Sequence, residues 1–421
     1  MRKLSLGLIV FTLLTYSCRK TDWESGINND KFPGKGRRIH VSNVASFYNA
    51  INDPANEGGT IVLAPGTYAL NSNFPKNGRI ELAHNMSLVG KPGDANAVVI
   101  DVTGLPASAY VVPPTATYPF QLRTGPIRVG NGYNAIEWLT IKNNPQNIIR
   151  SMIQTDIVAI QNATDPAPPV QVRIAHTIIK GSSIGINIIN RDAVSNGRIV
   201  EAEIENNEIL ENNIPQFGSG VQVQNSQALT GALIKVTLRG NYIHHNKNGL
   251  NILNSSSENN RIIARSIGDR LEENGVGLAL SAGLNTVRGA AKGNSIQFEA
   301  DGTTILNNRG VPFPIPNFIA GGVFIAGANV GSMSGSTGAP ETVNNNKLEA
   351  IFKGCKIENN IGDNQINAFG AYSNLPSPLP AGDHNDVVIT LLGSSKKATV
   401  NATPSFPDEP DVTNSLTVHR L

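Results

Sequence analysis

Charged side chains in the middle of the chain are the first residues whose types and spacing could support chemistry. Removing a proton beside a carboxylate needs a cation that neutralises the carboxylate and a base that takes the proton. Lys180, Arg191 and Arg239 are the candidates for these catalytic roles. Further charged candidates in the same stretch are Asp192, Glu203, Glu205 and Lys235. These residues alternate with Ile, Val and Leu, so an ordinary solvated strand face is the alternative interpretation.

The adjacent histidines His244 and His245 are a second candidate. A histidine at an exposed corner can bind a metal ion or transfer a proton near neutral pH. Nearly the same position in neighbouring repeats holds carboxylates, namely Glu208, Glu211, Glu272 and Glu273. Two histidines alone are weak evidence for a metal, so the sequence assigns no metal ligand. The alternative is an exposed histidine corner flanked by solubilising glutamates.

Uncharged amides mark the outward positions of strands that begin with Gly, as in Gly220-Val221-Gln222-Val223. The candidates for binding a substrate are Asn187, Gln222, Gln224 and Asn251, and Asn254 follows the same pattern. Side-chain amides both donate and accept hydrogen bonds, so such a series can bind sugar hydroxyls. It can equally stabilise itself through stacked amides.

These residues all belong to a repeat. A phrase rich in Asn and Ile recurs at residues 205–213, 240–246 and 355–360, with fainter copies at 270–274 and 304–308. A period of roughly 30–35 residues with alternation inside each unit is typical of a coiled β-solenoid. Because a solenoid exposes apolar side chains at its first coil, it needs a cap. Apolar residues at helical spacing from Val44 to Ile51 predict a capping helix with Ser42 as its N-cap.

The entry to the repeat resembles a known family. The capping helix followed by Gly58-Gly59-Thr60-Ile61-Val62-Leu63-Ala64-Pro65-Gly66-Thr67-Tyr68 is similar to the start of pectin-lyase-like β-helices. The resemblance implies an all-β fold, a single-stranded right-handed parallel β-helix with an N-terminal helical cap, over residues 39–421. Loop insertions near 104–120 and 309–345 depart from regular coils and are expected to wall a groove.

The same resemblance makes activity an open question. The superfamily includes lyases, hydrolases, epimerases, tailspikes and members without activity. Its hydrolases carry paired carboxyl groups, and Asn190-Arg191-Asp192 is the nearest imitation here, without an adjacent Asp-Asp pair. Calcium is expected only if the chain is a lyase; otherwise no cofactor is evident.

The N-terminus predicts export. Arg2 and Lys3 precede an apolar run that ends before Cys18, an arrangement that resembles a bacterial lipoprotein signal. Residues 1–17 are then a signal peptide, Cys18 is lipidated, and residues 18–38 are a flexible tether at the outer membrane. An ordinary signal peptide with a chance cysteine is the alternative. The only other cysteine, Cys355, is expected in the apolar interior.

Composition narrows the partners. A formal net charge of +2 gives no bulk attraction for nucleic acid. The family resemblance, the outward amides and the lipoprotein-like N-terminus together imply a carbohydrate-associated envelope lipoprotein that binds polysaccharide along its groove. One alternative is a polysaccharide lyase acting by β-elimination on a uronate-containing glycan, and another is a structural or adhesive surface solenoid. Whether the chain is an enzyme and what its oligomeric state is stay open at this point.

Overall fold

The computed structural model describes residues 36–82, 85–106, 125–130, 132–143, 151–155, 169–191, 195–213, 218–226, 229–285, 290–312, 319–330, 343–362, 365–373, 382–406 and 413–421. Cys18, the expected signal peptide and nearly all of the expected tether lie outside this part of the chain. Within it, no helix is both long and apolar enough to cross a membrane.

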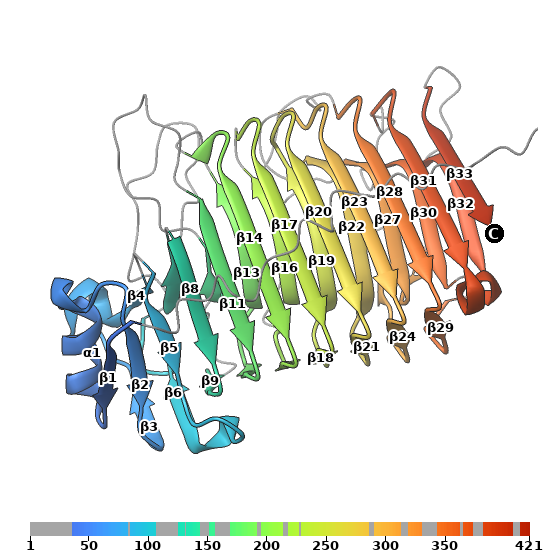
Figure 1. Ribbon diagram of the computed structural model, residues 1–421. Helices are drawn as coiled ribbons and strands as arrows, with labels where there is room; N and C mark the ends of the chain where they lie inside the picture. Colours follow the sequence, from blue (N-terminus) through green and yellow to red (C-terminus); the bar gives the residue numbers. More distant parts are fainter. Residues whose placement is uncertain are drawn as a thin grey trace, which may run out of the picture. The chain divides into compact units, whose positions relative to one another are not determined.

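Three parallel sheets form the body of the described chain, and the chain visits them in the order A, B, C in successive coils (Figure 1). Sheet A contains β1 (Arg38–Val41), β2 (Thr60–Leu63), β5 (Ser87–Val89), β8 (Gly132–Glu137), β11 (Val170–Ala175), β14 (Ile199–Glu205), β17 (Leu233–Arg239), β20 (Arg261–Ile267), β23 (Ser295–Asp301), β28 (Lys347–Lys353), β31 (Asp386–Leu392) and β33 (Ser415–Arg420). Sheet B contains β3 (Gly66–Ala69), β6 (Val98–Asp101), β9 (Thr140–Lys142), β12 (Ile178–Lys180), β15 (Glu208–Leu210), β18 (Tyr242–His244), β21 (Arg270–Glu272), β24 (Thr304–Leu306) and β29 (Lys356–Glu358).

Sheet C contains β4 (Ile80–Leu82), β7 (Ile127–Val129), β10 (Ser151–Gln154), β13 (Ile184–Arg191), β16 (Ser219–Ser226), β19 (Asn248–Ser255), β22 (Val276–Asn285), β27 (Val323–Val330), β30 (Ile366–Ser373) and β32 (Val400–Phe406). Each strand pairs in parallel with the equivalent strand of the next coil, and the fold is therefore a single-stranded right-handed parallel β-helix. This confirms the solenoid expected from the repeat and the fold class that the family resemblance implies.

Alternating side chains build the core. In β14 the residues Val200, Ala202 and Ile204 are buried, while the glutamates between them face outward. Because coils stack in register, each inward side chain packs on the same position of the coil above and below, as Ile209 does on Ile243. This stacking makes one continuous apolar core along the helix axis.

Asparagine ladders close the corners of the coils. Between sheets B and C, the backbone N–H of Asn212 donates to Oδ1 of Asn246 at 3.0 Å, and Asn246 donates likewise to Asn274 at 3.0 Å. The ladder continues through Asn308 to Asn360. Beside it the chain must be glycine: a Cβ on Gly277 would lie 2.5 Å from Cγ2 of Ile305. The Gly that leads these strands is therefore a packing requirement.

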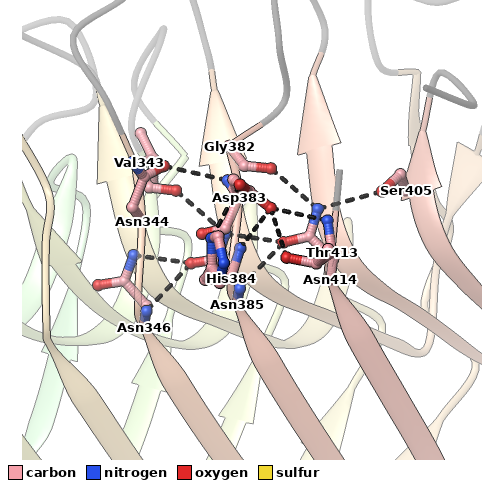
Figure 2. Close-up of polar contacts among 10 residues, drawn as sticks. All are labelled: Val343, Asn344, Asn346, Gly382, Asp383, His384, Asn385, Ser405, Thr413 and Asn414. Atoms are coloured by element: carbon pink, nitrogen blue, oxygen red, sulfur yellow. Dashed lines mark hydrogen bonds and ion pairs between the residues drawn. The ribbon is translucent and has the colours of Figure 1, made fainter. Parts of the chain in front are cut away.

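A second ladder stands between sheets C and A. It runs through Asn260, Asn294, Asn346, Asn385 and Asn414, each backbone N–H donating to the amide oxygen of the next coil. Figure 2 shows its C-terminal end, where the carboxylate of Asp383 also accepts from the backbone and hydroxyl of Thr413. These hydrogen bonds lower the pKa of Asp383 below its usual value.

The N-terminal cap is helix α1 (Val44–Asn52), which buries Phe47, Tyr48 and Ile51 against the first coils. The expected N-cap Ser42 was wrong by one residue. Asn43 caps the helix, because its side chain accepts from the backbone of Ser46 while the Ser46 hydroxyl accepts from the Asn43 backbone. The chain also forms the short 3-10 helices η3 (Pro54–Asn56), η4 (Pro75–Gly78), η5 (Ala95–Ala97) and η7 (Gly393–Lys397).

Two expectations about departures from the repeat need comment. The region 309–345 includes the hairpin β25 (Val311–Pro312) and β26 (Ile319–Ala320), but it also contains β27, a regular strand of sheet C. Its alternating apolar residues stack on β22, so this part is not an insertion. Most of the insertion expected near 104–120 lies outside the described residues. Cys355 is buried, as expected, and burial raises the pKa of its thiol.

The ladder between sheets A and B yields a test. It runs through Asn207 and Asn241 and ends on the carboxylate of Asp269, whose pKa burial raises to about 6. The folded chain thus holds this proton more tightly than the unfolded chain does. Asp269 therefore favours folding at low pH, and its contribution is lost as the pH rises through about 6.

We expect Asp269→Asn to keep the bond from Asn241 and to remove this loss. The difference in unfolding free energy between variant and parent should therefore shift in favour of the variant by roughly 1–3 kcal/mol when the pH rises from 4 to 7.5. Urea unfolding at the two pH values measures the gain, with the exposed Asp94→Asn as control. If the variant and the parent show the same dependence of stability on pH, the raised pKa of the buried Asp269 carboxyl is contradicted.

Candidate functional site

The connections between strands distinguish sheet C from the other two sheets. Only Gly240 and Asn241 separate β17 in sheet A from β18 in sheet B, and neighbouring coils repeat this short corner. In contrast, residues 307–322 separate β24 from β27, and residues 331–346 separate β27 from β28. The long and variable connections thus enter and leave at the two edges of sheet C. In repeat folds such edges flank the binding face.

A continuous row of outward side chains crosses the whole of sheet C. We call it the floor row; in order it consists of Glu81, Arg128, Gln154, Asn187, Gln222, Asn251, Ala279, Phe324, Asn367 and Asn401. Since adjacent strands lie about 4.8 Å apart, the row presents one side chain at each such interval along the axis.

The floor row changes character along its length. It begins with the ion pair between Arg128 and Glu81, at 2.7 Å. The middle of the row is uncharged, with four consecutive amides from Gln154 to Asn251. Ala279 and Phe324 follow, and Phe324 packs against Phe369 with ring centroids 5.8 Å apart. The row ends in the amides Asn367 and Asn401, so a chain laid along this face would meet one apolar stretch between two polar ones.

These outward side chains are sheltered from solvent. All residues of β13 and β16 are buried, including those that point away from the core. Asn187 is 2% exposed and Gln222 is 8% exposed. In the same strand as Gln222, the hydroxyl of Ser219 is buried without a hydrogen-bond partner in the part of the chain that the structure describes. These polar groups are therefore buried although they point away from the core, unlike those of an ordinary solvated strand.

The hydrogen bonds of the floor amides are long. Nε2 of Gln224 donates to Oδ1 of Asn187 at 3.3 Å, and Nδ2 of Asn251 donates to Oε1 of Gln222 at 3.5 Å. In the interior ladders the corresponding bonds range from 2.7 Å, from Asn308 to Asn360, to 3.4 Å, from Asn260 to Asn294, but Nδ2 of Asn308 also donates to the carbonyl of Leu271 at 3.2 Å. Hydrogen bonds weaken with distance, so the floor amides keep capacity that the interior amides have used.

The four amides expected to bind a substrate thus lie on one face: Asn187, Gln222 and Asn251 in the floor row and Gln224 beside it. Asn254 differs, because it points inward and accepts from Nδ2 of Asn225 at 2.9 Å. Sequence reasoning missed Gln154, since β10 lacks the leading Gly of its neighbours. It also missed Arg128 and Phe324, which only the register brings into the row.

The three residues expected to be catalytic do not converge. Lys180 ends β12 in sheet B, Arg191 ends β13 in sheet C, and Arg239 ends β17 in sheet A. Each points outward from a different sheet. Arg239 contacts Glu205 at 3.7 Å, and Arg191 is 9% exposed at the border of the sheltered face. The structure therefore gives no common site for these three side chains.

Sheet A carries a cluster of ion pairs on its outer side. Arg173 pairs with Glu137 in the previous coil and with Glu205 in the next, at 3.0 Å for Glu205, and it lies 4.0 Å from Glu203. Burial, and then the neighbouring Glu205, raise the pKa of Glu203. Arg173 is thus the central cation among three carboxylates.

Sheet B carries the histidine pair. Stacking of the coils puts His244 between Leu210 and Glu272, with Glu208 and Glu273 within hydrogen-bond or ion-pair reach of the two rings. Burial lowers the pKa of His244. Among the described residues, no three His, Cys, Asp or Glu side chains are grouped so that they could hold a metal ion.

Comparison with known proteins assigns no family to the chain. No family model matches the chain, and no curated protein does. Among solved structures, the A-module of the mannuronan C-5 epimerase AlgE4 from Azotobacter vinelandii is 15% identical, with 89% of this chain and 100% of that chain covered and a TM-score of 0.38.

Two lyases are similar to a comparable degree. Pectate lyase Pel9A is 14% identical over 77% of this chain and 78% of its own, with a TM-score of 0.35. The alginate lyase AlyGC is 10% identical over 91% of this chain and 71% of its own, with a TM-score of 0.30. Likenesses this distant carry no argument about activity. The class, a parallel β-helix protein with one sheltered polar face, rests on the strand pairing described above.

The ion-pair cluster of sheet A gives a prediction. Replacing Arg173 by Met leaves Glu137, Glu203 and Glu205 close together, with like charges that repel when ionised. We expect a loss of roughly 1–3 kcal/mol in unfolding free energy at pH 7.5, and a smaller loss at pH 4, where carboxylates take up protons. Chemical denaturation at both pH values measures this. Arg261→Met, at an exposed position of the same sheet, is the control, and equal losses at both pH values would argue against the repulsion.

Proposed function

We propose that this protein binds a polysaccharide whose chain lies along the outer face of sheet C, parallel to the helix axis. One observation carries the proposal: a sheltered row of outward amides, with unused hydrogen-bonding capacity, lies between the edges from which the long connections leave. Polar side chains on a solvated strand face are normally exposed, whereas these are buried. The amides of the interior ladders already use their hydrogen-bond donors and acceptors, whereas these do not.

A polymer fits this face better than a small molecule does. The floor row repeats a side chain at about 4.8 Å, and so a linear ligand meets an equivalent contact on each successive coil. Amides donate and accept at once, which matches the hydroxyl groups of sugars. Successive coils of the protein can thus contact successive units of a linear glycan.

The charges near the row favour a glycan over a nucleic acid. Glu81 is neutralised by Arg128 at 2.7 Å and by Lys76 at 2.7 Å, and the amides that follow are neutral. A phosphate backbone calls for a line of unpaired cations. The net charge of +2 gives no such field.

The cellular setting belongs to the same proposal. Lipidation at Cys18 would hold the β-helix at the outer membrane through the tether of residues 18–38, where extracellular or periplasmic glycans are within reach. A lyase would need a base and a cation at one point. The outward positions of Lys180, Arg191 and Arg239 on three different sheets favour binding instead.

The test is to probe a glycan array with the parent chain and then to measure the affinity of the protein for each glycan that it binds. We expect Gln222→Leu to weaken binding roughly tenfold, because one donor and one acceptor are lost from the floor while the side-chain volume is kept. The matched control is Gln297→Leu, an outward glutamine of sheet A, which should bind as the parent does.

Three outcomes would overturn the proposal: the parent chain binds no glycan on the array, the two variants weaken binding equally, or a glycan is cleaved with a rise in the ultraviolet absorbance of unsaturated uronates. The last result would establish a lyase.

A further inference from the structure

The histidine pair of sheet B is separate from the floor row and has a geometry of its own. His244 is the last residue of β18, and His245 occupies the corner that leads to sheet C. His245 has a left-handed backbone, with φ of 55°, as does the equivalent corner residue Glu273 of the next coil, with φ of 53°. The backbone of this corner therefore holds the two histidine rings edge to face, with centroids 5.0 Å apart.

The two rings face each other through one nitrogen each. Nδ1 of His244 lies 2.7 Å from Nδ1 of His245. The other nitrogens point to carboxylates: Nε2 of His244 lies 3.4 Å from Glu208, and Nε2 of His245 lies 2.9 Å from Glu273. A carboxylate accepts from a ring N–H. When both Nε2 atoms carry the proton, both Nδ1 atoms present lone pairs to the space between the rings, where a cation can bind.

Carboxylates in this relation to histidine are the usual orienting partners of metal-binding imidazoles. With the proton held on Nε2, Nδ1 is available to a cation. We propose that His244 Nδ1 and His245 Nδ1 bind one monovalent copper ion. Glu208 and Glu273 are positioning residues for the two ligands.

The number of ligands selects the metal. No third His, Cys, Asp or Glu of the described chain joins the two nitrogens. Zinc takes three or four ligands from a protein and is poorly served by two. Imidazole suits copper, and monovalent copper, which has a single charge as well as a filled d shell, accepts two ligands in a line.

The two histidines of the proposed site differ in exposure: His244 is buried and His245 is accessible to solvent. His244 is 7% exposed, and its ring stacks on Tyr242 with centroids 4.0 Å apart. The side chain of His245 is 43% exposed, so it can move outward to widen the 2.7 Å gap and admit the ion. The nearby carboxylate of Glu272 is engaged by Arg270 and Asn307 and does not compete for the rings.

The experiment is a competition for monovalent copper, without oxygen, between the whole chain and a chromophoric copper chelator. The parent chain should retain one equivalent of copper. His245→Asn should bind at least a hundredfold more weakly, and Asn is chosen because it tolerates the left-handed corner. His384→Asn is the matched control, since His384 also has a left-handed backbone, with φ of 54°, and lies beside a carboxylate.

A second variant separates ligand from positioning residue. Glu273→Gln should keep one copper and the two-nitrogen signature in X-ray absorption, but with affinity reduced about 10–100-fold. The proposal is overturned if the parent chain yields all copper to the chelator, if His245→Asn retains it as the parent does, or if His384→Asn loses it equally. Glycan binding is not involved, so these results stand apart from the test of the floor row.

Discussion

The constraint on which the structure depends is that every coil must satisfy the backbone of its corners inside an apolar core. Buried N–H groups without partners cost free energy, and a solenoid repeats this cost at every turn. Stacked asparagines meet it, because each amide oxygen accepts a corner N–H of the previous coil, at 3.0 Å from Asn212 to Asn246. Since the ladder works only in register, it also holds each sheet in alignment, and the positions of all outward residues follow from it.

The same residue type therefore has two roles in this chain. Inward asparagines of the ladders bond to both backbone and side chain, as Asn308 does to Leu271 and Asn360, and stabilise the corners. Outward amides such as Gln222 and Asn251 meet at 3.5 Å and retain capacity for a ligand. Composition cannot separate these roles, because strand alternation and register decide on which side of the sheet each amide lies.

The three outer faces differ in chemistry for the same reason. Sheet A pairs Arg173 with carboxylates of adjacent coils, sheet B stacks His244 and His245 near Glu208 and Glu273, and sheet C shelters the floor row. Only sheet C has long connections at both edges, so it is the face suited to a large ligand. The proposed glycan site and the proposed copper site thus occupy different faces and can act independently.

The sequence by itself determined the architecture. The repeat, the alternation and the apolar stripe of residues 44–51 predicted the β-helix, its cap and the burial of Cys355, because each is a local pattern. Tertiary structure alone decided which residues share a face: it divided Lys180, Arg191 and Arg239 among three sheets and joined Gln154 to Asn187. It also turned Asn254 inward while Asn251 faces outward. The physical reason is that neighbours on a face come from different coils, and connections of unequal length hide from the sequence which residues the register brings together.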